Sequence, residues 1–266
     1  MFTFPVEINT DIQETPRHIG SSARQDDASK GIGTLNEKPL HESLKQWYAH
    51  PGDVFEVPVD GSIVDIVRGD LLIEIQTRNF GAIRRKLEKL VVRHPVRLVY
   101  PIASEKWIVK VDGDEGLPIS RRRSPKHGAF EHVFEELVRF PKLLSSPSFS
   151  LELLLVQEEE VRRYDGVAGW RKGGWVTYER RLLGVVDRRT LATAGDLIDF
   201  LPYYLPEPFT ATDLSVMSSM PKRLAQRMVY CLRLVGCITP IGKRGNSVLY
   251  ARVKSGLKFR FLRLGR

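Results

Sequence analysis

Two acidic side chains interrupt neighbouring apolar segments of the chain. Asp65 lies within IVDIV and Glu74 within LLIEIQ, with eight residues between the two acids. Both segments have the alternating, β-branched pattern of strands, and Gly69 and Asp70 mark a tight turn between them. Antiparallel pairing therefore brings Asp65 close to Glu74, and alternation places Glu74 and Gln76 on one face of their strand. Because a charge inside an apolar strand is costly, we expect each acid to have a specific partner.

Two kinds of partner satisfy such acids. Hard oxygen ligands suit Mg²⁺ or Mn²⁺, and Glu42 on the preceding segment supplies a third carboxylate. Such an ion activates a water molecule and stabilises the charge that develops on a phosphate. The alternative is that Asp65 and Glu74 are edge-strand residues paired with arginines, while Glu42 lies on an ordinary solvated helix face. The arginines near enough in the sequence are Arg68, Arg78 and Arg84.

The elements that position these acids follow one another at short intervals. Leu40, Leu44, Trp47 and Tyr48 have helical spacing, and His-Pro-Gly at 50–52 ends that helix. Three strand-like segments follow: DVFEVPVDG, SIVDIVRGD and LLIEIQTR. AIRRKLEKLVVRH is helical in its spacing, and VRLVYPI is a short, apolar strand. The order is helix, three strands, helix, strand.

This ordered set of elements and acids resembles the core of the PD-(D/E)XK nuclease superfamily over residues 35–102. That superfamily includes restriction endonucleases and Holliday-junction resolvases. The resemblance implies an α/β fold of the mixed α+β kind, with a mixed central sheet flanked by helices, and metal-dependent cleavage of phosphodiester bonds. It also implies that Asp65, Glu74 and the backbone carbonyl of Ile75 bind Mg²⁺ or Mn²⁺, with Glu42 as an auxiliary acid. Members of this kind are often dimers, so a homodimer is a further implication.

Gln76 departs from the family pattern, in which most members have lysine at this position. Glutamine carries no positive charge and cannot act as a base, although its amide can orient a water molecule by hydrogen bonds. Two hypotheses follow. In the first, Asp65, Glu74 and Gln76 form the catalytic site of a metal-dependent DNA endonuclease. In the second, the chain is a non-catalytic DNA-binding or regulatory protein that keeps a degenerate nuclease core as a scaffold.

The positive charge of the chain is concentrated at its C-terminal end. Forty-one Lys and Arg against 32 Asp and Glu give a net charge of +9 and a pI near 9.6, which favours nucleic acid as a partner. Residues 190–266 hold 12 basic and 4 acidic side chains, so this part alone carries +8. Nucleic acid is therefore expected to bind there.

The C-terminal part has the element order of a winged helix-turn-helix. AGDLIDFLP is a short helix, and Thr210 or Thr212 is the N-cap of a second one. Pro221 opens a third helix that Gly236 ends, and a hairpin with Lys243 near its tip follows. In such modules the third helix enters the major groove and the wing contacts phosphates. The expected DNA-binding residues are Lys222, Arg223, Gln226, Arg227, Lys243 and Arg244. The alternative is an adaptor whose winged helix binds protein.

Three other basic segments have two interpretations each. Arg121, Arg122 and Arg123 with Lys126 form either a second phosphate-contacting loop or a solvated loop. The segment 170–175 combines tryptophans with basic side chains, which suits contact with a nucleic-acid strand or a hairpin packed on the core. The tail LKFRFLRLGR is either a strand added to the wing or a patch for a partner.

These patterns divide the chain into three parts and exclude several classes of protein. We expect a flexible arm over 1–34, a nuclease-like α/β domain over 35–190, and a winged-helix domain with a basic tail over 191–266. Two cysteines, the absence of a signal sequence and the absence of a long apolar run indicate a cytoplasmic protein, nucleoid-associated in a prokaryote, without membrane contact. No phosphate-binding G-x-x-x-x-G-K-[ST] loop or H-E-x-x-H zinc motif occurs.

Overall fold

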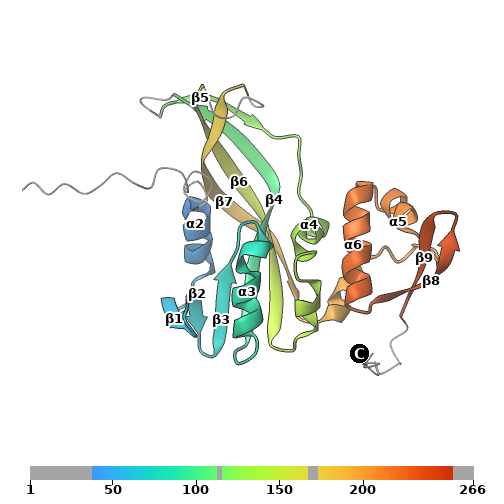
Figure 1. Cartoon of the computed structure of the whole chain (residues 1–266). Helices are drawn as coiled ribbons and strands as arrows, with labels where there is room; N and C mark the ends of the chain where they lie inside the picture. Colours follow the sequence, from blue (N-terminus) through green and yellow to red (C-terminus); the bar gives the residue numbers. More distant parts are fainter. Residues whose placement is uncertain (1–37, 113–115, 167–172, 254–266) are drawn as a thin grey trace, which may run out of the picture.

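The computed structural model describes residues 38–112, 116–166 and 173–253 (Figure 1). The predicted arm over 1–34, the basic residues at 171 and 172 and the basic tail lie outside these described residues. None of the described helices has both the length and the hydropathy needed to cross a membrane.

A seven-stranded mixed sheet forms the centre of the molecule. Its strand order is β1-β2-β3-β4-β6-β7, and β5 pairs with the distal half of β4. The pairs β3–β4 and β4–β6 are parallel, and the remaining pairs are antiparallel. The strands are β1 (Val54–Val59), β2 (Ser62–Arg68), β3 (Leu71–Ile75), β4 (Val96–Val111), β5 (Pro118–Arg123), β6 (Phe149–Tyr164) and β7 (Trp175–Leu191).

Helices cover both faces of this sheet. On one face, α2 (Lys38–Tyr48) buries Leu40 and Leu44 in a cluster with Ile73 and Ile75 of β3. On the other face, α3 (Phe80–Leu90) buries an apolar stripe in the larger core, to which Leu72 of β3 belongs. Successive side chains of β3 therefore point to opposite faces and pack in two separate cores, one on each side of the sheet. This confirms the predicted fold class, a mixed central sheet flanked by helices.

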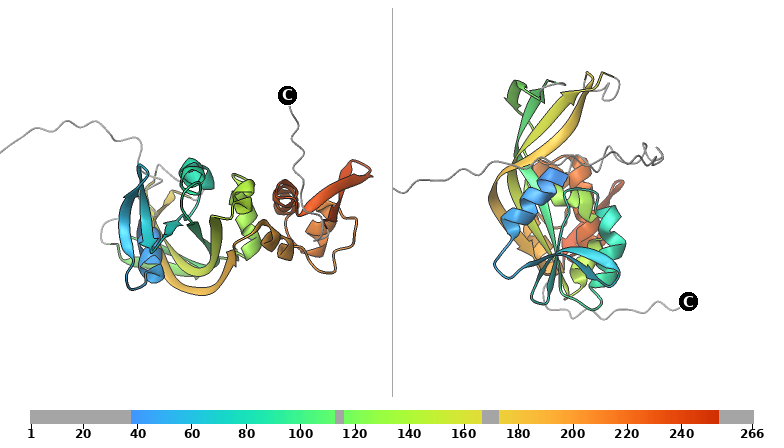
Figure 2. Two further views of the ribbon diagram at one scale, coloured as in Figure 1. Left: turned by 90° about the horizontal axis from the view of Figure 1, so that it is seen from below. Right: turned by 90° about the vertical axis from the view of Figure 1, so that its left-hand side faces the viewer.

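Three strands are much longer than the sequence pattern indicates. β4, β6 and β7 contain 16, 16 and 17 residues, and with β5 they extend beyond the helices as a strand arm (Figures 1 and 2). We define the strand arm as residues 105–111, 118–123, 157–164 and 175–182. The prediction of a loop at Arg121–Arg123 is wrong, because these residues form the edge strand β5.

Ion pairs hold the strand arm together. Arg121 pairs with Glu159 at 2.9 Å and stacks on Trp107, while Arg123 pairs with Glu105. Trp175 packs edge-on against Tyr164 and beneath the Lys110 ammonium. Arg121, Arg123 and Trp175 therefore contact other residues of the strand arm.

The sequence of FEHVFEELVRF predicts a helix, but the segment contains little α-helix. It forms one 3-10 turn, η1 (Phe130–Val133), and one α-helical turn, α4 (Phe134–Leu137), and η2 (Pro141–Ser145) follows. Val133, Phe134 and Leu137 nevertheless enter the larger core. Burial of these side chains, rather than helix length, fixes the position of the segment.

Two helices and a hairpin follow the sheet, as predicted from the sequence. Thr210 is the N-cap of α5 and accepts a hydrogen bond from the Asp213 N–H, and Gly236 follows α6 with φ of +80°. The segment AGDLIDF is a 3-10 helix rather than an α-helix. The elements are η4 (Ala194–Phe200), α5 (Ala211–Met217), α6 (Lys222–Leu234), β8 (Ile238–Arg244) and β9 (Ser247–Arg252).

One apolar core connects this C-terminal part to the sheet. Leu224, Met228 and Leu232 of α6 lie in the same buried cluster as Phe134 and Leu137 of α4. Contacts between α6 and the segments α4, η1 and η2 join the two parts (Figure 2). The division of the chain at 190 and 191 stays a prediction.

Truncation of Phe80 tests the packing that holds α3 on the sheet. Phe80 is fully buried, stacks on Phe140 at 5.0 Å and meets the edge of Tyr100 at 4.8 Å. We expect Phe80→Ala to lower the free energy of unfolding by about 3–5 kcal/mol, because it leaves a cavity in the core. Val92→Ala, at an exposed position, should change it by less than about 0.5 kcal/mol. Urea unfolding measures both, and equal effects would contradict the assignment.

Candidate active site

The two predicted acids lie where β3 loses its pairing with β2 and stays paired with β4 alone. β2 and β3 pair from Arg68↔Leu71 to Ile66↔Ile73, and the ladder stops one position before Asp65 and Glu74 would face each other. β3 instead continues in parallel register with β4. The Ile75 N–H donates to Oδ2 of Asp65 at 2.8 Å, so a side chain takes the place of a ladder hydrogen bond. The antiparallel hairpin thus brings the acids together, as predicted.

Glu74 is a buried carboxylate with a lysine against it. Its side chain lies on the α3 side of the sheet, and the residue is only 2% exposed. Nζ of Lys86, from α3, lies 2.5 Å from Oε1 of Glu74 and also donates to the Ile63 carbonyl at 2.5 Å. This close ion pair is the contact that Oε1 of Glu74 makes in the described structure.

Burial dominates the acidity of Glu74. Removal from water raises its pKa from 4.5 to about 7, and the nearby charge of Asp65 acts in the same direction. The positive charge of Lys86 opposes both effects. Glu74 is therefore a carboxyl group that holds its proton far more tightly than an exposed glutamate.

Asp65 has the opposite electrostatic character. Nε2 of His41, on α2, lies 3.2 Å from Oδ2 of Asp65. Burial alone would raise the pKa of Asp65, but the bond and charge of His41, with the Ile75 N–H, hold that pKa below its ordinary value. The same contact raises the pKa of His41 against the effect of its own burial. Asp65 is therefore ionised while its neighbour Glu74 resists ionisation.

Glu42 is connected to Asp65 only through His41. Its side chain is 56% exposed, and Oε1 lies 3.2 Å from Nζ of Lys45 and 3.5 Å from Nδ1 of His41. Lys45 is itself buried and pairs also with Glu56. Glu42 thus lies at the rim, on the side of the site that α2 covers.

Gln76 and Ile75 complete the set of predicted site residues. The Gln76 amide donates to the Arg78 carbonyl, and its backbone N–H donates to the Val99 carbonyl at 2.9 Å. Ile75 contributes its backbone N–H to Asp65, while its side chain lies in the core beneath α2. Gln76 therefore occupies the predicted position but uses its side-chain donor locally.

Two of the three arginine partners of the alternative interpretation have acidic partners other than Asp65 and Glu74. Arg68 pairs with Asp53, and Arg84 pairs with Glu88. The residues missed by the sequence analysis are His41 and Lys86. Lys86 lies three residues after Ile83 and four before Leu90, on the buried stripe of α3. This spacing indicates from the sequence that the Lys86 side chain points toward the sheet. Across the described residues, no three His, Cys, Asp or Glu side chains are arranged as a metal site, and Mg²⁺ or Mn²⁺ stays a prediction.

The six predicted DNA-binding residues are placed in different environments. Lys222, Arg223 and Gln226 are exposed on α6, and Lys243 is exposed in β8. Arg227 lies 3.8 Å from Glu135, while Arg244 pairs with Asp213 and so ties the hairpin to the start of α5. A groove of about 770 Å³ between α6 and the hairpin is lined by Lys222, Gln226, Arg233 and Asn246, among others. Four of the six side chains are thus available to a partner.

The acidity of Glu74 predicts a loss of stability with rising pH. Its pKa is about 7 in the folded chain and near 4.5 ordinarily, so the unfolded chain releases this proton first. The free energy of unfolding should therefore fall between about pH 4.5 and 7, by roughly 3 kcal/mol from this group. Urea unfolding should show that loss for the wild type relative to Glu74→Gln, with Glu88→Gln as the exposed control. A constant difference between wild type and Glu74→Gln would contradict the assignment.

Comparisons with known proteins identify relatives without a described activity. Residues 38–192, which include the sheet and the candidate site, match a family model described as Domain of unknown function (DUF8091). The chain is 33% identical over 229 residues to an uncharacterized protein of Treponema pallidum (strain Nichols), which covers 85% of this chain and 89% of that relative. No solved structure matches the chain. The extent of both matches shows that the chain belongs to the DUF8091 family.

Proposed function

We propose that the protein is a metal-dependent DNA endonuclease with a PD-(D/E)XK-like core. The observation that carries this proposal is the pair of acids at the point where the β2–β3 ladder ends. Glu74 is only 2% exposed there, and the Lys86 ammonium, 2.5 Å from Oε1, is its cationic partner. A buried acid with a raised pKa beside a second acid and a lysine is an arrangement that is common in active sites.

The residues at this point fit a hard divalent cation. Asp65, Glu74 and the Ile75 carbonyl offer oxygen donors, which Mg²⁺ and Mn²⁺ prefer. Such an ion supplies an activated water and offsets the charge that develops on a phosphate. Lys86 already places one positive charge against Glu74, which indicates that the site tolerates a cation.

The chain's own side chains have separate roles in this proposal. His41 holds Asp65 in its ionised form and fixes its orientation through Nε2. Lys86 supplies, from α3, the positive charge that Gln76 does not supply from β3. Gln76 orients water once its amide is released from the Arg78 carbonyl. Glu42 adds negative charge at the rim and keeps Lys45 and His41 in place.

The C-terminal helices and hairpin would hold the DNA as a winged helix. Lys222, Arg223 and Gln226 lie on the exposed face of α6, the helix that would enter the major groove. Lys243 lies near the hairpin turn and would contact a phosphate. Arg244 secures Asp213 instead, so its contribution is to the rigidity of the wing. Such a protein would work in the cytoplasm, at the nucleoid in a prokaryote.

A second function is a DNA-binding or regulatory protein with an inactive core. The observation in its favour is that Gln76 stands at the usual lysine position and donates to a backbone carbonyl. A protein adaptor is a third reading of the winged helix. Cleavage assays separate the first two functions, and salt-dependent DNA binding separates both from the adaptor.

Cleavage of DNA tests the catalytic proposal. The full chain should cut linear, nicked or branched DNA in Mg²⁺ or Mn²⁺, and Asp65→Ala and Glu74→Ala should each lower the rate by roughly a hundredfold or more. Lys86→Met should lower it as well, because no other side chain supplies that charge to Glu74 in the described structure. Glu88→Ala, an exposed acid on α3, is the matched control. Cleavage that survives both carboxylate substitutions rules out this site, and metal binding without cleavage favours the second function.

Salt dependence of DNA binding tests the role of the wing. Lys243→Ala should reduce the slope of log affinity against log salt by about one, since one phosphate contact is lost. Arg93→Ala, which removes an exposed arginine after α3, should leave the slope unchanged. Fluorescence anisotropy with a labelled duplex measures both slopes. Binding that does not respond to salt would favour the adaptor.

A further inference from the structure

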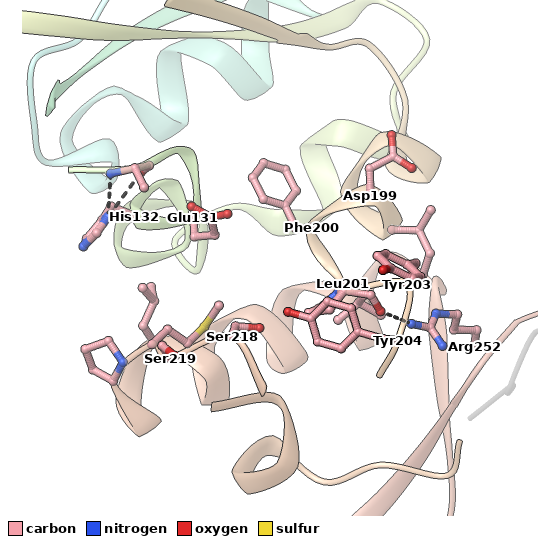
Figure 3. A pocket seen from close by; sticks show the side chains of 16 residues that line it. Glu131, His132, Asp199, Phe200, Leu201, Tyr203, Tyr204, Ser218, Ser219 and Arg252 are labelled. Atoms are coloured by element: carbon pink, nitrogen blue, oxygen red, sulfur yellow. Dashed lines mark hydrogen bonds between the residues drawn. The ribbon is translucent and has the colours of Figure 1, made fainter. Parts of the chain in front are cut away.

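A cavity separates the end of the sheet from the turn between α5 and α6. It has a volume of about 1040 Å³, and residues of η1, of η4 and of the turn around Ser219 surround it (Figure 3). Most of its lining is apolar. The apolar side chains that matter most here are Ile198, Phe200, Leu201, Tyr204, Met220 and Leu224.

Exposed aromatic rings stand at the mouth of this cavity. Tyr203 is 93% exposed and meets the edge of Tyr204 at 5.0 Å between ring centres. Tyr204 donates its hydroxyl to the Met217 carbonyl at 3.2 Å, and Val216 and Met217 are themselves exposed beside it. An apolar patch with aromatic rings at its rim is the usual mark of a binding surface. The cavity therefore suits a partner with apolar side chains.

The charge around the cavity is negative, although the chain as a whole is positive. Glu131 and Asp199 line it, and the lining residue Arg252 is already paired with Glu207 at 2.8 Å. Arg189 pairs with Asp199 at 3.5 Å, and the Asp199 side chain remains 67% exposed. Phosphate groups would be repelled by such a rim, whereas lysine and arginine side chains would be attracted. The surface thus selects a basic, apolar segment rather than nucleic acid.

We propose that residues 254–266 of the same chain dock in this cavity. Their sequence, KSGLKFRFLRLGR, contains five basic and no acidic residues, with two phenylalanines and three leucines between them. Arg252, which lines the cavity, stands two positions before this segment. Thirteen residues at about 3.3 Å each reach up to roughly 43 Å when extended, so the segment spans the cavity without strain.

Docking of this segment would cover the exposed tyrosine rings and would bring counter-ions to the acids of the rim. Phe259, Phe261 or Leu262 would bury the rings of Tyr203 and Tyr204, and the basic side chains between them would face Glu131 and Asp199. The five positive charges would then be withdrawn from DNA binding. This inference does not depend on nuclease activity, because it concerns a different surface.

Photo-cross-linking in the full chain tests the proposal. With p-benzoylphenylalanine in place of Phe259, irradiation should give cross-links mainly to residues 198–204 and 218–224, mapped by mass spectrometry. The expected cross-links join residues of one chain, so a mixture of isotopically labelled and unlabelled chains should give no mixed products. Absence of cross-links to these two segments, or cross-links mainly between chains, overturns the proposal.

Charge reversal provides the matched comparison. Glu131→Lys combined with Asp199→Lys should lower the cross-link yield roughly fivefold or more, because two attractions become repulsions. Glu179→Lys, which reverses an acid on the strand arm, should leave the yield unchanged. Asp199→Asn alone, a milder change on an exposed side chain, should give a smaller loss. An unchanged yield in the charge-reversed and Asp199→Asn chains contradicts docking by charge complementarity.

Discussion

Glu74 is buried at the position where the β2–β3 ladder ends and β3 is paired with β4 alone. A carboxylate in this place has lost its water, and the cost of that loss appears as a pKa of about 7. Its immediate neighbours are a second carboxylate, Asp65, and the ammonium group of Lys86. An apolar residue would satisfy the strand better, so the acid is a constraint that the surrounding structure has to accommodate.

Two helices on opposite faces of the sheet meet this constraint. α2 directs His41 to Asp65, and α3 directs Lys86 to Glu74. Each helix is also held by its own apolar stripe, in separate cores on the two faces. The acids and the helices therefore depend on each other, because the packing positions the cations and the cations make the buried charges tolerable. A break in the β2–β3 ladder gives the two faces access to the same point.

The sequence predicts the local part of this arrangement and misses the part that depends on tertiary packing. Asp65 and Glu74 lie on consecutive strands joined by a tight turn, so their proximity follows from short-range geometry. The partners His41 and Lys86 could not be chosen over Arg68 or Arg84, since the choice depends on how each helix rotates against the sheet. The sequence does predict an exposed β-excursion over 158–184, but the pairing that makes it part of a strand arm was missed for a related reason. Its strands alternate charged and apolar side chains, and cross-strand ion pairs such as Arg121 with Glu159 form only after the strands have paired.

The placement of ion pairs also separates the positive charges that hold the fold from those that face outward. In the strand arm, Arg162 and Arg180 bind Glu160 and Glu158 on β6, at 2.8 and 2.5 Å, so these charges cancel within the sheet. In α6, by contrast, the described structure gives Lys222 and Arg223 no acidic partner. Basic side chains that are already paired with acids add little to the attraction of a polyanion. Basic side chains without an acidic partner, gathered on one helix face, contribute their whole charge to that attraction. A net charge of +9 therefore says less about function than the few cations on α6 and the hairpin that the fold leaves without a counter-ion.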